Sequence, residues 1–499
     1  MGHQSLADKF LLLKQAFQLR WLLLPLSVLS LLWPAFLNGE PLMFADTSAY
    51  VRAADAAVVK ITGHSTVWTR DGEIERLSGV RFVPTSPVGP LEQNRVPLLG
   101  RSIYYGVFAY AAYLFGSFWL LALVQAAVLG VAALLLHRRL LGPGAFTDPN
   151  RLAALLLVLA VCTTAPFFCS FAMPDLFAGL SILAATLLLT QSGIRDPAER
   201  WVCFAIAAIG GLFHASHILL LLGLAVLALA ARFVVRTKIS KPGLICVAAA
   251  AGLGLAGEFV FVQGVTVATG ESPIRPPFVT ARLIDDGPGL RYLRDTCPQN
   301  GLFLCRFKDR LPLHSDTFLW GATAPQGVFN TLDPADKRRL ASEQTKFVLQ
   351  VVRERPFEVV ASSLSSALHQ LRLFQLPEFN YPGIFDSSGL PAAEQVKVAR
   401  TRAMRGDMPT LIFGLFASTM AALALISLLL QAWEQRIDRR LVALVISGIL
   451  LNAFICGALS TPHDRYGARV MWLLPMLAAA ALLTPQSASR ASASCPRRP

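Results

Sequence analysis

Charged residues are scarce in this chain. Asp, Glu, Lys and Arg together make up 15% of its 499 residues, whereas hydrophobic residues make up 54%. The mean hydropathy is +0.53. A soluble core could not hide so much apolar surface, so lipid must serve as part of the solvent. The composition therefore excludes a soluble enzyme and predicts an all-α polytopic membrane protein.

A signal-peptide cleavage site and an internal repeat are also missing. Lys9, Lys14 and Arg20 precede an apolar stretch, which is the order found in a signal peptide, but no A-x-A-like site follows it. We therefore expect an uncleaved first helix. The lack of a repeat weakens the case for a transporter, because transporters are often built from repeated halves.

Cysteine is rare outside the apolar segments and the tail. Of the eight cysteines, only Cys297 and Cys305 fall in a long polar segment. Pro298 and the Asn300-Gly301 pair between them favour a turn that brings the two sulfurs together. We expect a disulfide there, in an oxidising compartment. We expect no metal at this pair of cysteines, because zinc would need two more ligands.

Ten apolar segments are long enough to cross a bilayer. Their approximate limits are 20–37, 118–137, 151–168, 174–191, 201–215, 217–235, 243–268, 409–431, 441–460 and 469–484. An even number places both termini on one side. The basic residues in the short segments on that side are Lys9, Lys14, Arg20, Arg138, Arg139, Arg151, Arg195, Arg200, Arg232, Arg236, Lys238, Lys241, Arg436, Arg439, Arg440, Arg490, Arg497 and Arg498.

In the short turns on the opposite side, Arg465 is the only Lys or Arg residue. The positive-inside rule thus predicts a multi-pass protein of the bacterial inner membrane with cytoplasmic N- and C-termini. This topology accounts for the net charge of +14, so we expect the lipid bilayer and no nucleic acid as a partner.

The apolar pattern divides the chain into three parts. Residues 1–268 form an N-terminal membrane module that includes a first periplasmic loop, 38–117, with interfacial helices. Residues 269–408 form a periplasmic segment far longer than a connection requires, and such a segment is usually a lid or a small domain. Residues 409–499 supply the last three membrane helices and a cytoplasmic tail.

Ionisable residues gather where the apolar segments meet the outer side. Such residues are costly to place near lipid, so each suggests a function. They are Asp46 after the first segment, Arg101 in the Arg101-Ser102-Ile103-Tyr104-Tyr105-Gly106 run, Asp175 after Pro174, His214 and His217 in a tight turn, and His463, Arg465 and Arg469 near the last segment. We expect a bundle to bring them around one outward-facing cavity.

The residue types suit a reaction between a lipid-linked phosphate and a hydroxyl group. Guanidinium groups bind phosphate in a bidentate manner, and a carboxylate can remove a proton from a hydroxyl. Asp46 is the candidate general base, with Asp175 as the second candidate. Tyr50 shares the helical face of Asp46.

Other roles are open for the same residues. Asp46 could cap a helix, and Asp175 could be a first-turn acid favoured by the helix dipole. His214 and His217 could pack a hairpin. The arginines could snorkel to headgroups, and the tyrosines at positions 104, 105 and 110 are expected in an aromatic belt.

These motifs together resemble the GT-C superfamily of membrane glycosyltransferases, which take sugars from polyprenyl-phosphate carriers. The resemblance covers residues 20–270 and 409–484. It implies a GT-C-like fold, with Asp46 as the first-loop catalytic acid and Arg465 with Tyr466 near the donor phosphate. Two departures are the missing second acid beside Asp46, which leaves a divalent cation uncertain, and the position of residues 269–408 between membrane helices.

The sequence therefore predicts a glycosyltransferase, acting by inversion. Its donor would be a polyprenyl-phosphate-linked sugar and its acceptor a glycan, a lipid or a protein. Arg465, Arg469 and Arg101, with Tyr466, would bind the donor phosphate, while Tyr50, His214, His217 and His463 would line the pocket. Two alternatives from other classes are a lipid-linked-sugar transporter or flippase, and a non-catalytic subunit of an envelope assembly.

Overall fold

The computed structural model describes residues 22–63, 67–68, 98–141, 148–190, 197–323, 326–382 and 389–484. These residues form helices and connections, and among them β-pairing is limited to two isolated bridges, Leu42 with Phe171 and Leu98 with Ile274. The predicted all-α class is confirmed. The basic residues at 9, 14 and 20, those at 490, 497 and 498, Arg195, and most of the polar excursion in the first loop lie outside the described residues.

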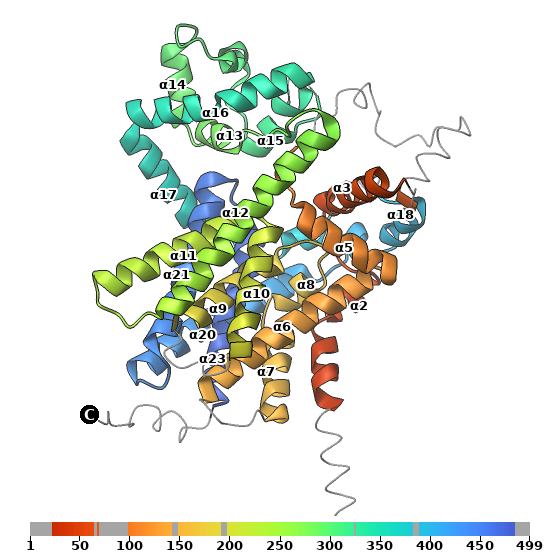
Figure 1. The fold of residues 1–499 in the computed structure, drawn as a ribbon, viewed down its shortest axis with the longest axis vertical. Coiled ribbons are helices and arrows are strands. Elements are labelled where there is room, and N and C mark those ends of the chain that lie inside the picture. Colours follow the sequence, from red (N-terminus) through yellow and green to blue (C-terminus); the bar gives the residue numbers. More distant parts are fainter. Residues whose placement is uncertain are drawn as a thin grey trace, which may run out of the picture.

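A bundle of mostly apolar helices forms the larger part of the molecule (Figure 1). Its helices are α2 (Trp33–Asn38), α6 (Phe118–Leu141), α7 (Pro149–Cys162), α8 (Ala165–Cys169), α9 (Leu176–Thr190), α10 (Pro197–Phe213), α11 (Ala215–Phe233), α12 (Lys241–Thr269), α20 (Thr410–Trp433), α21 (Arg439–Leu459), α22 (Asp464–Met471) and α23 (Leu473–Leu482). In the part of the chain that the structure describes, five of them, α6, α11, α12, α20 and α21, are long and apolar enough to cross a membrane. The chain is thus a multi-pass membrane protein.

Helix α9 lies at the centre of this bundle. Every residue from Leu176 to Thr190 is buried, and α6, α10, α11, α12 and α21 all pack against it. A helix that is apolar on all sides is stable only when other helices or lipid surround it. The residue that precedes α9, Asp175, is therefore held at a fixed place at one end of the bundle.

Three of the predicted spans are broken. In the first, two turn residues, Leu31 and Leu32, separate a helix over residues 22–30 from α2. The third consists of α7 and α8, with Pro166 near the start of the second piece. The tenth consists of α22 and α23, which meet at Trp472. Pro475 lies just beyond that junction, and proline has no N–H to continue the hydrogen bonds of a preceding helical turn. The count of ten spans remains a prediction.

Two helices of the first loop pack closely against each other. They are α3 (Ala45–Thr62) and α5 (Ile103–Phe115). A Cβ atom at Gly106 would collide with the backbone carbonyl of Tyr50, so only glycine allows this approach. The tyrosines expected in an aromatic belt include two core residues instead: Tyr105 and Tyr110 are 0% and 3% exposed. That expectation was wrong for these two, because α5 packs on α3 and the bundle.

The segment 269–408 divides between two hydrophobic cores. Its helices are α13 (Phe278–Asp285), α14 (Pro288–Thr296), η2 (Phe303–Arg310), α15 (Ser315–Trp320), η3 (Phe329–Thr331), α16 (Pro334–Glu354), α17 (Pro356–Arg372), η4 (Pro377–Phe379), α18 (Ala392–Ala399) and α19 (Arg402–Arg405). Buried side chains between Ile274 and Val351 form a core of their own, and the helices α13 to α16 that supply it lie at the top of Figure 1. Buried side chains between Leu376 and Met408 belong to the core of the membrane module.

Helix α17 connects these two parts by running alongside α21. Its neighbours α13 to α16 form the outer domain, by which we mean residues 274–351. Cys297 and Cys305 form a disulfide within that domain. The chain that follows α17 leads directly to η4 and to the end of the bundle where the ionisable residues lie.

Candidate functional site

Asp46 lies in the first turn of α3 but is not its cap. The N-cap position is Phe44, and the Thr47 hydroxyl accepts a hydrogen bond from the Phe44 backbone N–H at 3.0 Å. The carboxylate of Asp46 pairs with the guanidinium of Arg101, and the two side chains are 29% and 30% exposed. The interpretation of Asp46 as an N-cap is wrong, because the N-cap is Phe44 and Asp46 is the second residue of the helix. Asp46 remains accessible to a ligand.

Asp175 is shared between two arginines. Its Oδ1 lies 3.6 Å from Nε of Arg465 and 3.3 Å from Nη1 of Arg469, and the Asp175 side chain is 4% exposed. Arg469 has further partners, since its Nη2 donates to the Asn452 side-chain oxygen at 3.0 Å. Two buried guanidinium groups thus share one buried carboxylate. Asp175 is therefore better placed to hold the two arginines in position than to act as a free base.

Arg465 is held between aromatic rings. Its guanidinium carbon lies 4.1 Å from the centre of the Phe44 ring and 5.2 Å from that of Tyr466. One of its terminal nitrogens, Nη1, is buried and has no hydrogen-bond partner among the described residues. The residue is only 7% exposed, so it does not snorkel toward headgroups. A buried guanidinium donor without an acceptor favours an anionic oxygen at this place.

The pKa of Tyr50 is affected by both the acids and the arginines of the site. Its hydroxyl group is fully buried, and burial raises its pKa. The charges of Asp46 and Asp175 raise that pKa further, while those of Arg101 and Arg465 lower it. Four charged groups from distant parts of the chain therefore lie within electrostatic range of one tyrosine. Tyr50 itself is packed beneath the site, with its ring 5.2 Å from that of Tyr105.

His214 and His217 hold the turn between α10 and α11. Nδ1 of His214 accepts from the backbone N–H of Ser216 at 3.2 Å, as an N-cap does. Nδ1 of His217 lies 3.0 Å from the carbonyl oxygen of Gly210, and this histidine is 1% exposed. Both contacts fit the packing interpretation. The hydroxyl of Ser216 also lies 3.4 Å from Nη2 of Arg469, which connects this turn to the arginines.

A cavity of about 360 Å³ opens beside the charged groups. It is lined by Phe44, Leu373, Pro377, Glu378, Asn380, Tyr381, Pro462, His463 and Asp464. These residues come from the start of the first loop, the chain after α17 and the turn before α22. Among the pocket residues predicted from sequence, His463 lines it, whereas the structure places Tyr50, His214 and His217 elsewhere in the cluster.

Glu378 is a site residue that the sequence did not single out. Its Oε1 accepts from the backbone N–H of Arg465 at 3.2 Å. Its Oε2 is buried and has no partner among the described residues. Burial raises the pKa of this carboxyl, although Arg465 and His463 oppose the effect. The only signal in the sequence was an acid directly after Pro377, where the helical pattern of the outer segment ends.

His463 connects the cavity to the outer domain. Its Nε2 lies 3.1 Å from Oδ2 of Asp316 in α15, and its Nδ1 lies 3.9 Å from Oε1 of Glu378. The side chain of Gln370 on α17 bonds both the backbone N–H and the carbonyl of His463, at 2.9 and 2.8 Å. The position of the outer domain therefore influences the wall of the cavity.

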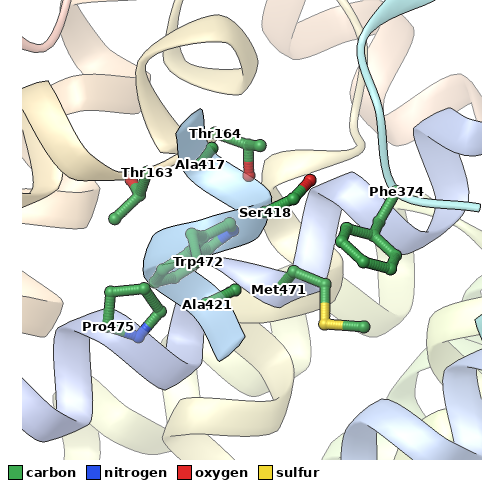
Figure 2. A pocket seen from close by; sticks show the side chains of 9 residues that line it. All are labelled: Thr163, Thr164, Phe374, Ala417, Ser418, Ala421, Met471, Trp472 and Pro475. Carbon is green, nitrogen blue, oxygen red and sulfur yellow. The ribbon is translucent and has the colours of Figure 1, made fainter. Parts of the chain in front are cut away.

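A second cavity lies between α7, α20 and α23. Figure 2 shows Thr164, Ser418 and Trp472 around it. Its volume is about 10 Å³, which is about the space of one water molecule. The hydroxyls of Thr164 and Ser418 already donate to backbone carbonyls. This cavity is too small for a substrate.

Comparison with known proteins gives no relative. No family model, no curated protein and no solved structure matches the chain. Within the described residues, no group of three or more His, Cys, Asp or Glu side chains is arranged to hold a metal ion. Function must therefore be inferred from the geometry of the site and the membrane character of the bundle.

Proposed function

We propose that the protein is a membrane glycosyltransferase with a GT-C-like arrangement. It transfers a sugar unit from a polyprenyl-phosphate donor to an acceptor at the periplasmic face of the bacterial inner membrane. The observation that supports this most is the pair of buried guanidinium groups, Arg465 and Arg469, on one carboxylate, Asp175. The two arginines carry more donors than Asp175 can satisfy, and this imbalance leaves Nη1 of Arg465 without a partner among the described residues, at the edge of a membrane helix bundle.

A phosphate on a lipid carrier satisfies this imbalance. Its oxygens accept from Arg465 Nη1, and the low dielectric of a buried site strengthens the attraction. Asp175 holds the arginines in place, and Asn452 fixes Arg469 from the other side. The carrier chain would lie along the apolar helices. Such a site stabilises the phosphate more as it takes up charge, which is when the sugar departs.

Asp46 is the base in this proposal. The acceptor hydroxyl attacks the anomeric carbon and gives its proton to Asp46. The bond between that carbon and the phosphate oxygen breaks, and its electron pair stays on the phosphate. Arg101 pairs with Asp46 before the donor arrives. A donor phosphate competes for Arg101, so the carboxylate becomes a free base only when the donor is bound.

The test is the loss of transfer in Asp46→Asn. Purified protein in proteoliposomes is given a panel of undecaprenyl-phosphate monosaccharides with a membrane extract as acceptor, and the release of undecaprenyl phosphate is measured with Mg²⁺ and with EDTA. Loss of a general base lowers the rate by about 10²–10⁴-fold. Asp407→Asn, an exposed acid paired with Arg405, is the matched control and keeps the full rate.

Two results contradict the proposal. Equal release of undecaprenyl phosphate by wild type and Asp46→Asn removes Asp46 as the base. Movement of the labelled carrier across the vesicle membrane without any release of phosphate favours the transporter or flippase alternative. Neither movement nor release, with every donor of the panel, favours the non-catalytic envelope subunit.

A further inference from the structure

The 360 Å³ cavity has the mixed lining of a sugar-binding pocket. Phe44, Pro377 and Tyr381 supply apolar and aromatic surface, while Glu378, His463 and Asp464 supply polar groups. Small-molecule pockets are mostly apolar with a few placed polar groups, and their volumes run from about 300 to 1,000 Å³. The cavity is at the small end of that range, which suits one sugar unit better than a chain of several.

Most polar side chains of the cavity already have partners. The Asn380 amide donates to the Met408 carbonyl at 2.7 Å, and its oxygen accepts from the Met408 N–H at 2.9 Å. Oδ1 of Asp464 accepts from the backbone N–H of Gln375 at 2.8 Å. Oε2 of Glu378, by contrast, is a buried acceptor without a partner in the described part of the chain. A ligand hydroxyl would satisfy it.

The cavity also lies beside the proposed phosphate site. Phe44 is a wall of the cavity, and the guanidinium of Arg465 lies over the same ring at 4.1 Å. The backbone N–H of Arg465 bonds Glu378. In a sugar phosphate the ring and the phosphate are directly linked. The two sites are therefore adjacent, as the sugar and the phosphate of one donor require.

We infer that this cavity receives the sugar unit of the donor and that Glu378 selects it by accepting hydrogen bonds from its hydroxyls, an inference that rests on the proposed function. A carboxylate oxygen accepts from two hydroxyls, so the arrangement of hydroxyls on the ring decides the fit. A ligand that lacks the matching hydroxyl leaves Oε2 buried and unpaired, and such a loss is costly. Glu378 is thus a specificity residue, distinct from the base Asp46.

The experiment compares the binding of two kinds of ligand, the bare carrier and sugar-bearing carriers, to the protein in lipid nanodiscs. Dissociation constants are measured for undecaprenyl phosphate alone and for each undecaprenyl-phosphate monosaccharide of the panel. In the wild type, at least one sugar-bearing carrier binds more tightly than the bare carrier. Glu378→Gln has the same shape but loses the charge and an acceptor oxygen, so it weakens binding of that sugar-bearing carrier roughly 10-fold or more. It does not weaken binding of the bare carrier, because the loss of a negative charge near Arg465 cannot disfavour a phosphate.

The control is Glu354→Gln, the same substitution at an exposed position of α16, which changes neither constant. Glu378→Asp, which keeps the charge on a shorter arm, lies between wild type and Glu378→Gln. The inference is overturned, and the proposed function is unaffected, if the ratio of the dissociation constants for the sugar-bearing and the bare carrier is the same in wild type and Glu378→Gln. Failure of the wild type to bind undecaprenyl phosphate overturns both, and a wild type that never prefers a sugar-bearing carrier overturns the inference alone.

Discussion

Glu378 illustrates how a single residue can trade stability for function. Its carboxyl is held in a partly buried place next to the cavity, with one oxygen unpaired among the described residues. Burial of a carboxyl without full hydrogen bonding disfavours its charged form. The free energy that would be gained by pairing this oxygen is left for a ligand. An enzyme site often contains such groups, and replacing them frequently stabilises the protein.

This trade predicts a pH dependence of stability. Because burial raises the pKa of Glu378 in the folded state, the folded state binds more protons than the unfolded state, and the contribution of Glu378 to stability is lost as pH rises through the folded-state pKa. Glu378→Gln cannot ionise, so we expect its melting temperature in detergent to exceed that of the wild type at pH 7.5, on the order of 2 °C.

That difference shrinks at about pH 4.5, near the ordinary pKa of a glutamate. Thermal unfolding followed by tryptophan fluorescence at both pH values measures it. Glu354→Gln serves again as the matched control and shows no such difference. A Glu378→Gln variant that is less stable than wild type at pH 7.5 contradicts the prediction, and would mean that the ionised carboxylate is stabilised by Arg465.

At the scale of elements, the contact of α17 with α21 sets the position of the cavity wall. Gly457 of α21 faces the backbone of α17: a Cβ atom there would lie 2.6 Å from the Ser366 carbonyl oxygen and 2.9 Å from Cα of Ala367. Gln370, one turn further along α17, bonds the backbone of His463. The glycine therefore allows a helix contact that brings the outer domain against the site.

We predict that Gly457→Ala separates these helices. The backbone of α17 must move to admit the methyl group, and overpacking of this kind costs about 1–3 kcal/mol. We expect a lower melting temperature and reduced release of undecaprenyl phosphate, because His463 moves with α17. Gly252→Ala is the matched control: Gly252 also lies in a spanning helix, α12, but nothing lies within 4 Å of its added Cβ. Equal losses in both variants contradict the prediction.

The helices themselves were largely predictable, whereas their ends and partners were not. Apolar length alone identified the five described helices that are long and apolar enough to cross a membrane, α6, α11, α12, α20 and α21, because lipid demands such segments. It did not identify the breaks at Thr163 and Trp472, which depend on local proline and packing. The ionisable residues at the ends of the apolar segments were also recognisable from the sequence, because ionisable residues are costly to place near lipid. Which of them pair could not be read from sequence, since Asp175 and Arg469 are joined only by tertiary packing.

At the scale of the whole molecule, the outer segment was predicted as one unit but is divided. Side chains from Leu376 to Met408 complete the membrane core, so η4 is fixed to the bundle and carries Glu378. The residues of the outer domain have their own core. The helical periodicity of residues 334–376 predicts helices there, but periodicity does not say which core a helix joins. The sequence therefore does not single out Glu378, because the role of this residue depends on which part of the fold it contacts.

The orientation of the whole molecule gives the last prediction. By the positive-inside rule, the basic residues of the short connections predict that the outer domain lies in the periplasm, where the disulfide between Cys297 and Cys305 could form and persist. Protein is denatured directly from cells in a maleimide reagent that adds a large mass to each free thiol, with and without prior reduction. We expect reduction to add two labelled thiols in wild type and none in the double variant that carries both Cys297→Ser and Cys305→Ser.

A C-terminal green fluorescent protein, which folds only in the cytoplasm, checks the other side of the membrane and should fluoresce. A C-terminal alkaline phosphatase, which is active only after export, should be inactive. If the thiols are equally reactive before and after reduction, and the phosphatase fusion is active, the molecule is inverted. The cavity would then face the cytoplasm, where a soluble nucleotide sugar competes with a lipid-linked donor, and the choice of a polyprenyl carrier would lose its topological basis.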